Sequence, residues 1–108
     1  MTESEFLAVA GAVLDDIETR IEPAADAAGV DVECSRSGNV LEIEFIDQGS
    51  KIIVNTQAPM QEIWVAARSG GFHFRMTDGL WRDTRAGTEL FAALSSLAST
   101  QAGQSLML

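Results

Sequence analysis

The chain has 108 residues, of which 46% are apolar and 21% are charged, the size and composition of one compact domain with a single core. Sixteen acidic residues against seven basic ones give a formal net charge of -9, which argues against a nucleic-acid backbone or an anionic membrane as a partner. The only cysteine, Cys34, excludes an internal disulfide framework and a clustered-thiol zinc site.

The N-terminus is polar and acidic and lacks the basic and apolar segments of a secretory signal. No apolar run is long enough to cross a membrane. We therefore expect a cytoplasmic protein whose natural partners are cations and basic protein surfaces.

Apolar residues from Phe6 to Ile21 recur every three or four positions, which predicts an amphipathic helix with one buried face. We expect Ser4 to cap the start of this helix. Pro23 is expected to mark its end, with the small residues 24–29 forming a connector or a loose last turn.

A stripe of carboxylates follows one flank of that helix. Asp15, Glu18 and Glu22 share the flank at i, i+3 and i, i+4 spacing, whereas Glu5 and Asp16 lie elsewhere on the helical wheel. Like charges at this spacing destabilise a helix slightly, and a cation or a basic partner would relieve that cost. Taken alone, such a stripe is more often a solvated face than a metal site.

Alternating apolar and polar residues predict about six strands between residues 30 and 82. In the first, Val30, Val32 and Cys34 alternate with Asp31 and Glu33, so that Cys34 is a small core residue and both carboxylates point outward. Turn residues at 37–39, 47–50, 70–71 and 78–79 indicate antiparallel hairpins.

A second amphipathic helix is predicted from Thr88 to the Ala102-Gly103 pair, followed by a peripheral tail, 104–108. The order of elements predicts an α+β fold. It is a two-layer α/β sandwich with two terminal helices on one face of an antiparallel sheet of about six strands.

One face of this sheet is left without helices. Ile63 and Val65 would face the core, so Trp64 would point outward in mid-sheet, near Asn55 and Gln57. An outward tryptophan is either incidental or an interface anchor, and we favour the anchor because aromatic residues are enriched at binding hot spots. His73 should also point outward, but the absence of a second histidine argues against a metal role.

Several segments occur in a recognisable order along nearly the whole chain. They are residues 49–55 (GSKIIVN), 63–66 (IWVA), 70–74 (GGFHF) and 81–83 (WRD). In this set the chain resembles the bacterial frataxins of the CyaY type. The resemblance implies a single frataxin-like domain over residues 1–108. It also implies an iron-binding, non-enzymatic regulator or adapter of iron–sulfur cluster assembly, which docks on the cysteine desulfurase and on the scaffold protein.

The family's iron and partner surface is an acidic ridge, which carries over here to six carboxylates: Asp15, Asp16, Glu18, Glu22, Asp31 and Glu33. The expected partner-binding residues are three of these and three on the sheet: Asp15, Glu18, Glu22, Asn55, Gln57 and Trp64. Carboxylate oxygens suit hard cations such as Fe2+ and Fe3+. Because the six are spread over a helix and a strand, we expect weak binding of iron.

Two departures from the family weaken the expectation of multi-site iron binding. The segment 24–29 carries one charge, Asp26, where many relatives are densely acidic, and Leu7 stands where some relatives have histidine. No motif brings a nucleophile and its base together, so we expect no enzyme. Two alternatives remain open for the same carboxylates: an iron store or ferroxidase built from iron-induced oligomers, and an acidic interaction domain without a metal role. The adapter hypothesis predicts a monomer.

Overall fold

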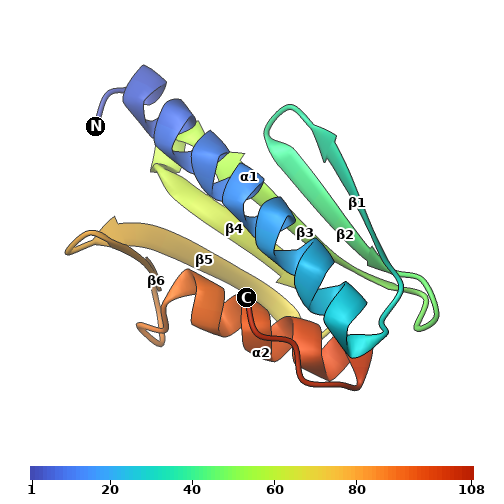
Figure 1. Cartoon of the computed structure of the whole chain (residues 1–108). Coiled ribbons are helices and arrows are strands. Elements are labelled where there is room, and N and C mark those ends of the chain that lie inside the picture. Colours follow the sequence, from blue (N-terminus) through green and yellow to red (C-terminus); the bar gives the residue numbers. More distant parts are fainter.

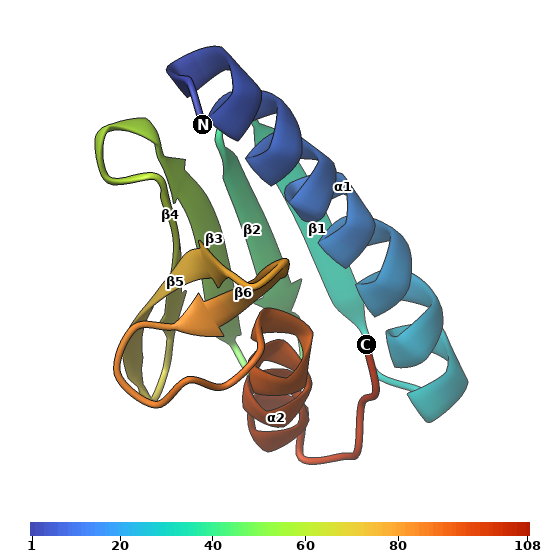
Figure 2. The ribbon, with the colours of Figure 1, turned by 90° about the vertical axis from the view of Figure 1, so that its left-hand side faces the viewer.

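The computed structural model describes residues 1–108 as a six-stranded sheet with a helix at each end of the chain (Figure 1). The elements are α1 (Glu3–Ala28), β1 (Val32–Ser37), β2 (Val40–Phe45), β3 (Ser50–Gln57), η1 (Ala58–Met60), β4 (Glu62–Ala67), β5 (Gly70–Thr77), β6 (Leu80–Asp83) and α2 (Leu90–Ala102). The strands pair antiparallel in the order β1 to β6, and both helices lie on the same side of the sheet (Figure 2). The predicted α+β sandwich is confirmed. Neither helix is both long and apolar enough to cross a membrane.

The core lies between the sheet and the helices. Helix α1 contributes a stripe with helical spacing, and its fully buried members are Phe6, Ala10, Leu14, Ile17, Ile21 and Ala25. Alternate residues of the central strands complete the layer, among them Ile43, Ile52, Val54, Ile63, Val65 and Phe74. The opposite face of the sheet is therefore the open face, and the residues between these core positions point into it.

Helix α1 starts earlier than predicted. Thr2 is its N-cap: the Thr2 hydroxyl accepts a hydrogen bond from the Glu5 backbone N–H at 3.1 Å, and the Thr2 N–H donates to the Glu5 carboxylate at 3.0 Å. This reciprocal pair is a capping box. The prediction of Ser4 as the cap was wrong, because Ser4 lies inside the first turn.

The same helix ends later than predicted. Pro23 lies inside α1, which continues to Ala28 and ends at Gly29 with a left-handed φ of 70°. Proline removes one backbone donor from a helix, but Ala25 is buried against the sheet and its carbonyl accepts a hydrogen bond from Val30 N–H at 2.9 Å. Pro23 was therefore the wrong end point, and packing beyond the proline explains why.

Helix α2 is fastened to the sheet by one buried polar side chain. Gln101 is 4% exposed. Its amide nitrogen donates to the Ser50 hydroxyl at 3.0 Å and to the Lys51 carbonyl at 3.2 Å, and its amide oxygen accepts from Arg68 N–H at 3.0 Å. One residue thus fixes α2 against β3 and the β4–β5 turn.

The C-terminal tail is packed rather than peripheral, which corrects the prediction. Leu106 is 1% exposed and belongs to the core. Its backbone N–H and carbonyl both bond the Ser99 hydroxyl, at 2.8 and 3.1 Å, and Leu108 N–H donates to the Ser95 hydroxyl at 3.0 Å. Two serines on α2 therefore hold the chain after Gly103 against the core.

Truncating Leu106 should destabilise the protein. We expect Leu106→Ala to lower the free energy of unfolding by about 2 to 5 kcal/mol, since it leaves a cavity in the core. Met107 is 80% exposed, so Met107→Ala should change stability by less than about 0.5 kcal/mol. Urea denaturation of both variants measures the difference, and equal midpoints would contradict the tail's role in the core.

Candidate functional site

The carboxylates of the acidic ridge on α1 fall into two kinds, and the first kind is already paired with arginine. An Asp15 carboxylate oxygen accepts a hydrogen bond from Arg36 Nη1 at 2.6 Å, and Arg36 lies on β1. The Asp16 carboxylate accepts two bonds from Arg20, at 3.0 and 3.2 Å, one turn further along the helix. Asp15 and Asp16 are thus partly neutralised within the chain itself.

The second kind, Glu18 and Glu22, has no basic partner in the structure. Both carboxylates lie close to Cys34 on β1. Burial raises the pKa of the Cys34 thiol to about 12, and the negative charges of Glu22 and Glu18 add to that effect. The thiol is therefore protonated at neutral pH, and the two glutamates are the free charges of the helix flank.

The two ridge carboxylates at β1, Asp31 and Glu33, do not lie on the same side of the sheet as α1. Cys34 pairs with buried Ile43 and faces α1, so its neighbour Glu33 faces the open side of the sheet, directly across from Glu44 on β2. Asp31 is exposed and immediately precedes β1. The acidic ridge therefore wraps around the edge strand, with carboxylates on both of its faces, instead of forming one flat stripe.

The ridge offers only carboxylate oxygens, which suit a hard cation such as iron. No three His, Cys, Asp or Glu side chains anywhere in the structure converge closely enough to hold a metal ion between them. Such a donor set fits a hydrated, loosely held cation better than a closed site. The assignment of iron to all six residues stays a prediction.

On the open face, the three sheet residues predicted to bind a partner lie together. Asn55 and Trp64 are directly opposite each other on β3 and β4, and Trp64 is opposite His73 on β5. The Trp64 and His73 rings stack with centroids 4.4 Å apart and planes 11° apart. Gln57 donates to the Asn55 side-chain oxygen at 2.6 Å. The predicted outward direction of Trp64 and His73 is confirmed.

Sequence reasoning missed the residue that holds this cluster in place. Glu62 is only 3% exposed although it lies on the open face. Its carboxylate accepts hydrogen bonds from Trp64 Nε1 at 2.8 Å and from Arg75 Nη2 at 2.5 Å, and lies 3.4 Å from His73 Nδ1. Arg75 is directly opposite Glu62 in the β4–β5 hairpin. The predicted turn at Gly70-Gly71 concealed this pair, because the chain turns two residues earlier, at Arg68 and Ser69, and the predicted register would have placed Ala66 opposite Arg75.

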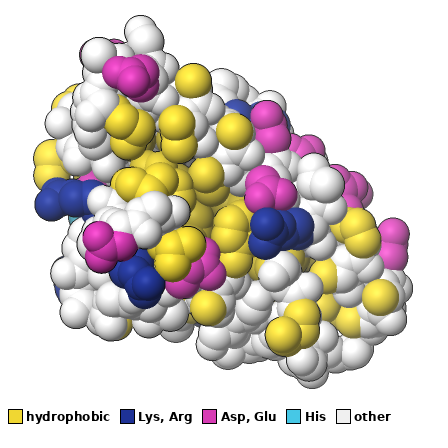
Figure 3. Space-filling model, turned by 60° about the vertical axis from the view of Figure 1, so that its left-hand side comes forward, with side chains coloured by type: hydrophobic (Ala, Val, Ile, Leu, Met, Phe, Trp, Pro, Cys, Tyr) yellow, Lys and Arg dark blue, Asp and Glu magenta, His cyan; other side chains and the backbone are white.

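The side of the molecule that carries α1 and the side that carries β5 and β6 differ in charge. A space-filling view shows Asp and Glu side chains spaced along the upper right edge, Lys or Arg side chains on the left, and a basic side chain beside an acidic one between them (Figure 3). The basic residues of the far strands include Arg75 and Arg82 on β5 and β6. The charge of -9 is thus unevenly distributed.

Comparison with known proteins identifies this architecture. The sequence model of the frataxin-like domain matches residues 1–104. The chain belongs to the frataxin family. Two relatives bear the name iron-sulfur cluster assembly protein CyaY. That of Janthinobacterium sp. (strain Marseille) is 68% identical over 103 residues, covering 95% of this chain and 92% of the relative. That of Herminiimonas arsenicoxydans is 63% identical over 108 residues, covering 100% and 96%.

Solved frataxin structures share the fold. Frataxin from Psychromonas ingrahamii superposes with a TM-score of 0.79 at 31% identity, covering 99% of this chain and 97% of that one. Trimeric frataxin from the yeast Saccharomyces cerevisiae, complexed with ferrous iron, gives a TM-score of 0.74 at 26% identity over 88% and 86% of the two chains. Both are similar over most of their length.

In this frataxin, the Glu62 carboxylate is held in its ionised form. Burial by itself would raise its pKa, but the hydrogen bonds from Trp64 and Arg75 outweigh burial, and the pKa lies below the ordinary value of 4.5. The unfolded chain keeps the ordinary value, so the ionised carboxylate stabilises the fold fully above pH 4.5. This stabilisation is lost as the pH falls through the lower, folded-state pKa.

Glu62→Gln should therefore flatten the acid side of the stability profile. We expect the free energy of unfolding of the wild type to fall more steeply below pH 4.5 than that of the variant, because glutamine has no proton to take up. Glu42→Gln is the control, since Glu42 lies on the same face in an exposed ion pair with Lys51 and such pairs contribute little. Urea denaturation from pH 3 to 7 measures the free energy of unfolding of each protein. Parallel pH profiles for wild type and Glu62→Gln would show that the ionised Glu62 carboxylate, bonded to Trp64 and Arg75, does not stabilise the fold.

Proposed function

We propose that this frataxin is a cytoplasmic, non-enzymatic regulator of iron–sulfur cluster assembly, which docks on the cysteine desulfurase through Asp15, Glu18 and Glu22 and binds iron weakly. The family and the names of its relatives support the pathway. The observation that carries the docking surface is the pair of unpartnered glutamates, Glu18 and Glu22, on a flank of α1 beside the edge strand.

Docking would be driven by charge. A basic patch on the desulfurase would meet two glutamates that have no internal partner, so no existing ion pair has to break. Asp15 is different, because its bond to Arg36 would have to be shared or exchanged. We therefore assign the larger part of the attraction to Glu18 and Glu22, and expect it to weaken as salt screens the charges.

Iron would use the same oxygens. Five of the six carboxylates lie on α1 and at β1 around the edge strand and would attract a hard cation, yet their separation leaves most of its coordination to water. Asp16 lies apart from them, because it pairs with Arg20, which packs over Phe91 of α2. Bound iron would lower the negative charge of the ridge, so iron and the desulfurase would influence each other's affinity through shared charge. Weak, exchangeable binding suits a regulator that senses or passes on iron.

The open face would serve the scaffold protein. Trp64 offers a broad, half-buried aromatic surface whose orientation is already fixed by Glu62 and His73, and a fixed anchor loses little entropy on binding. Asn55 and Gln57 lie beside it and supply amide groups for hydrogen bonds. This surface lies on the other side of the sheet from α1, so both partners can be bound together.

Reversing the free charges should abolish desulfurase docking without unfolding the protein. For Glu18→Lys combined with Glu22→Lys, we expect binding about tenfold weaker or worse at low ionic strength, because attraction becomes repulsion. The control, Glu3→Lys with Asp47→Lys, makes the same change in net charge at exposed sites outside the ridge and should bind nearly as wild type. Calorimetry with purified desulfurase measures both; equal losses would reject the ridge as the docking site.

Titration with Fe2+ should shift the backbone amide signals of residues 15–33 in two-dimensional NMR spectra and leave those of Asn55, Gln57 and Trp64 in place. Fast exchange is expected, because a hydrated cation held by few ligands leaves quickly. Unmoved signals would favour the acidic interaction domain without a metal role. Size-exclusion chromatography with excess iron and oxygen tests the other alternative: the regulator stays monomeric, whereas an iron store assembles into oligomers.

A further inference from the structure

A polar hollow lies at the β6 edge of the sheet, opposite the edge that carries the acidic ridge. Its volume is about 300 Å³, and none of its lining residues is apolar: Arg75, Thr77, Arg82, Asp83, Thr84 and Gly87. Pockets for drug-like molecules are lined mostly by apolar and aromatic side chains. The lining of this hollow therefore suits a small polar ligand.

Two guanidinium groups meet at this hollow. Arg75 and Arg82 are directly opposite each other in the β5–β6 ladder, a position at which like charges destabilise a sheet. Arg75 forms an ion pair with Glu62, in which Arg75 Nη2 donates a hydrogen bond to the carboxylate. Arg82 has no carboxylate partner, and its one bond is from Nη1 to the Gly87 carbonyl at 3.1 Å. One positive charge at this edge is left uncompensated.

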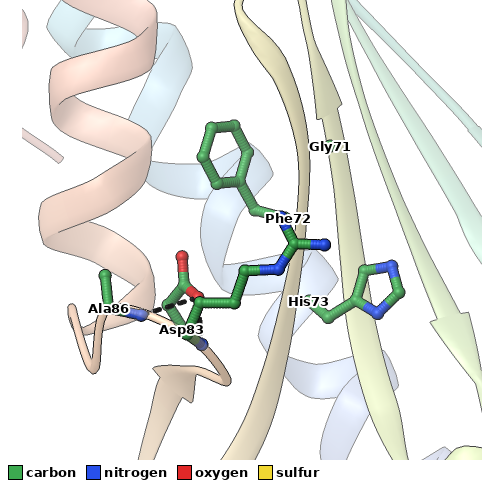
Figure 4. Close-up of a pocket in the computed structure, with 6 residues that line it drawn as sticks. Gly71, Phe72, His73, Asp83 and Ala86 are labelled. Atoms are coloured by element: carbon green, nitrogen blue, oxygen red, sulfur yellow. Dashed lines mark hydrogen bonds between the residues drawn. The ribbon is translucent and has the colours of Figure 1, made fainter.

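The nearby carboxylate, Asp83, is already engaged. One of its oxygens accepts hydrogen bonds from the backbone N–H groups of Arg85 and Ala86, at 2.7 and 3.2 Å, and so closes the loop after β6. Figure 4 shows Asp83 turned toward this loop, with His73 on the other side of β5. A second hollow of about 220 Å³, lined in part by Arg85 and His73, lies next to the first. Potential donors thus outnumber free acceptors at this edge.

We propose that the hollow between Arg75 and Arg82 is an oxyanion site, which binds a phosphate or a carboxylate group of a small molecule. A guanidinium group offers a planar fork of N–H donors that matches two oxygens of such a group. The hydroxyls of Thr77 and Thr84 line the same hollow and can each donate one further hydrogen bond. An oxyanion there would relieve the repulsion between the two arginines.

The net charge of -9 does not exclude an anion from this place. The ridge lies at β1 and the hollow at β6, five strand spacings apart, and at about 4.8 Å per spacing this is on the order of 24 Å. The Debye length at physiological ionic strength is about 8 Å. The repulsion from the ridge is therefore largely screened, and the local arginines decide what binds.

The test is a pair of NMR titrations, one with inorganic phosphate and one with citrate, each at constant ionic strength maintained with chloride. We expect saturable shifts of the amide signals of Thr77, Arg82 and Thr84. The stronger of the two anions identifies the group that the site prefers. Shifts that match those given by chloride alone would overturn the proposal.

Three variants sharpen the result. Arg82→Gln removes the uncompensated charge and should weaken binding about tenfold, the loss expected for one charge-assisted contact. Arg82→Lys keeps the positive charge but loses the planar fork of N–H donors, so its affinity for the anion should lie between those of the wild type and Arg82→Gln. If Arg82→Gln does not fold, weaker binding by Arg82→Lys than by the wild type tests the site in its place. Arg68→Gln is the control, since Arg68 is exposed, has no carboxylate partner and lies outside this hollow. Equal weakening by Arg68→Gln and Arg82→Gln would overturn the site.

Discussion

The packing of α1 against the sheet determines where the carboxylates of the acidic ridge lie in this frataxin. The stripe from Phe6 to Ala25 is buried along its whole length, so the direction of each remaining helix residue is fixed by its place in the 3.6-residue repeat. Glu18 and Glu22 flank that stripe on the side of β1 for this reason. Helix α2, held by Gln101, covers the rest of the same face, and the other face of the sheet has no helix on it.

An open sheet face has to satisfy its own polar groups, and here it does so around a buried carboxylate. Glu62 accepts bonds from Trp64 and Arg75, and these side chains in turn shield it from water. A buried charge that loses one partner is costly, because the remaining charge is left unsatisfied. The orientation of Trp64 is therefore fixed by its hydrogen bond to Glu62 and its stacking on His73. A partner that bound there, as proposed, would meet an aromatic surface that is already ordered.

Much of the fold could be predicted from the sequence, because periodicity reports which residues are buried. The alternation around Trp64 gave the correct face, and the turn residues gave the correct order of hairpins. The position of the β4–β5 turn was wrong, because the chain turns at Arg68 and Ser69 and the predicted turn residues, Gly70 and Gly71, begin β5. The errors came where packing outweighs local preference. Helix α1 passes Pro23 because Ala25 is buried beyond it, and Leu106 enters the core because Ser99 holds its backbone. In the candidate site, the wheel placed Glu18 and Glu22 correctly, but the pairing of Asp15 with Arg36 depends on the angle between helix and strand, which no local pattern encodes.

The protonation state of the Cys34 thiol bears on which atoms beside the acidic ridge could bind a metal ion. Cys34 is close to Glu18 and Glu22, and burial together with their charges keeps it in the protonated form. A protonated thiol is a poor nucleophile and a poor metal ligand, since both roles require the thiolate. Iron bound at the ridge would offset the charges of Glu18 and Glu22, and burial, the larger cause of the raised pKa of Cys34, would remain to favour the protonated thiol. Under the proposed function, the ligands offered to iron there are therefore carboxylate oxygens.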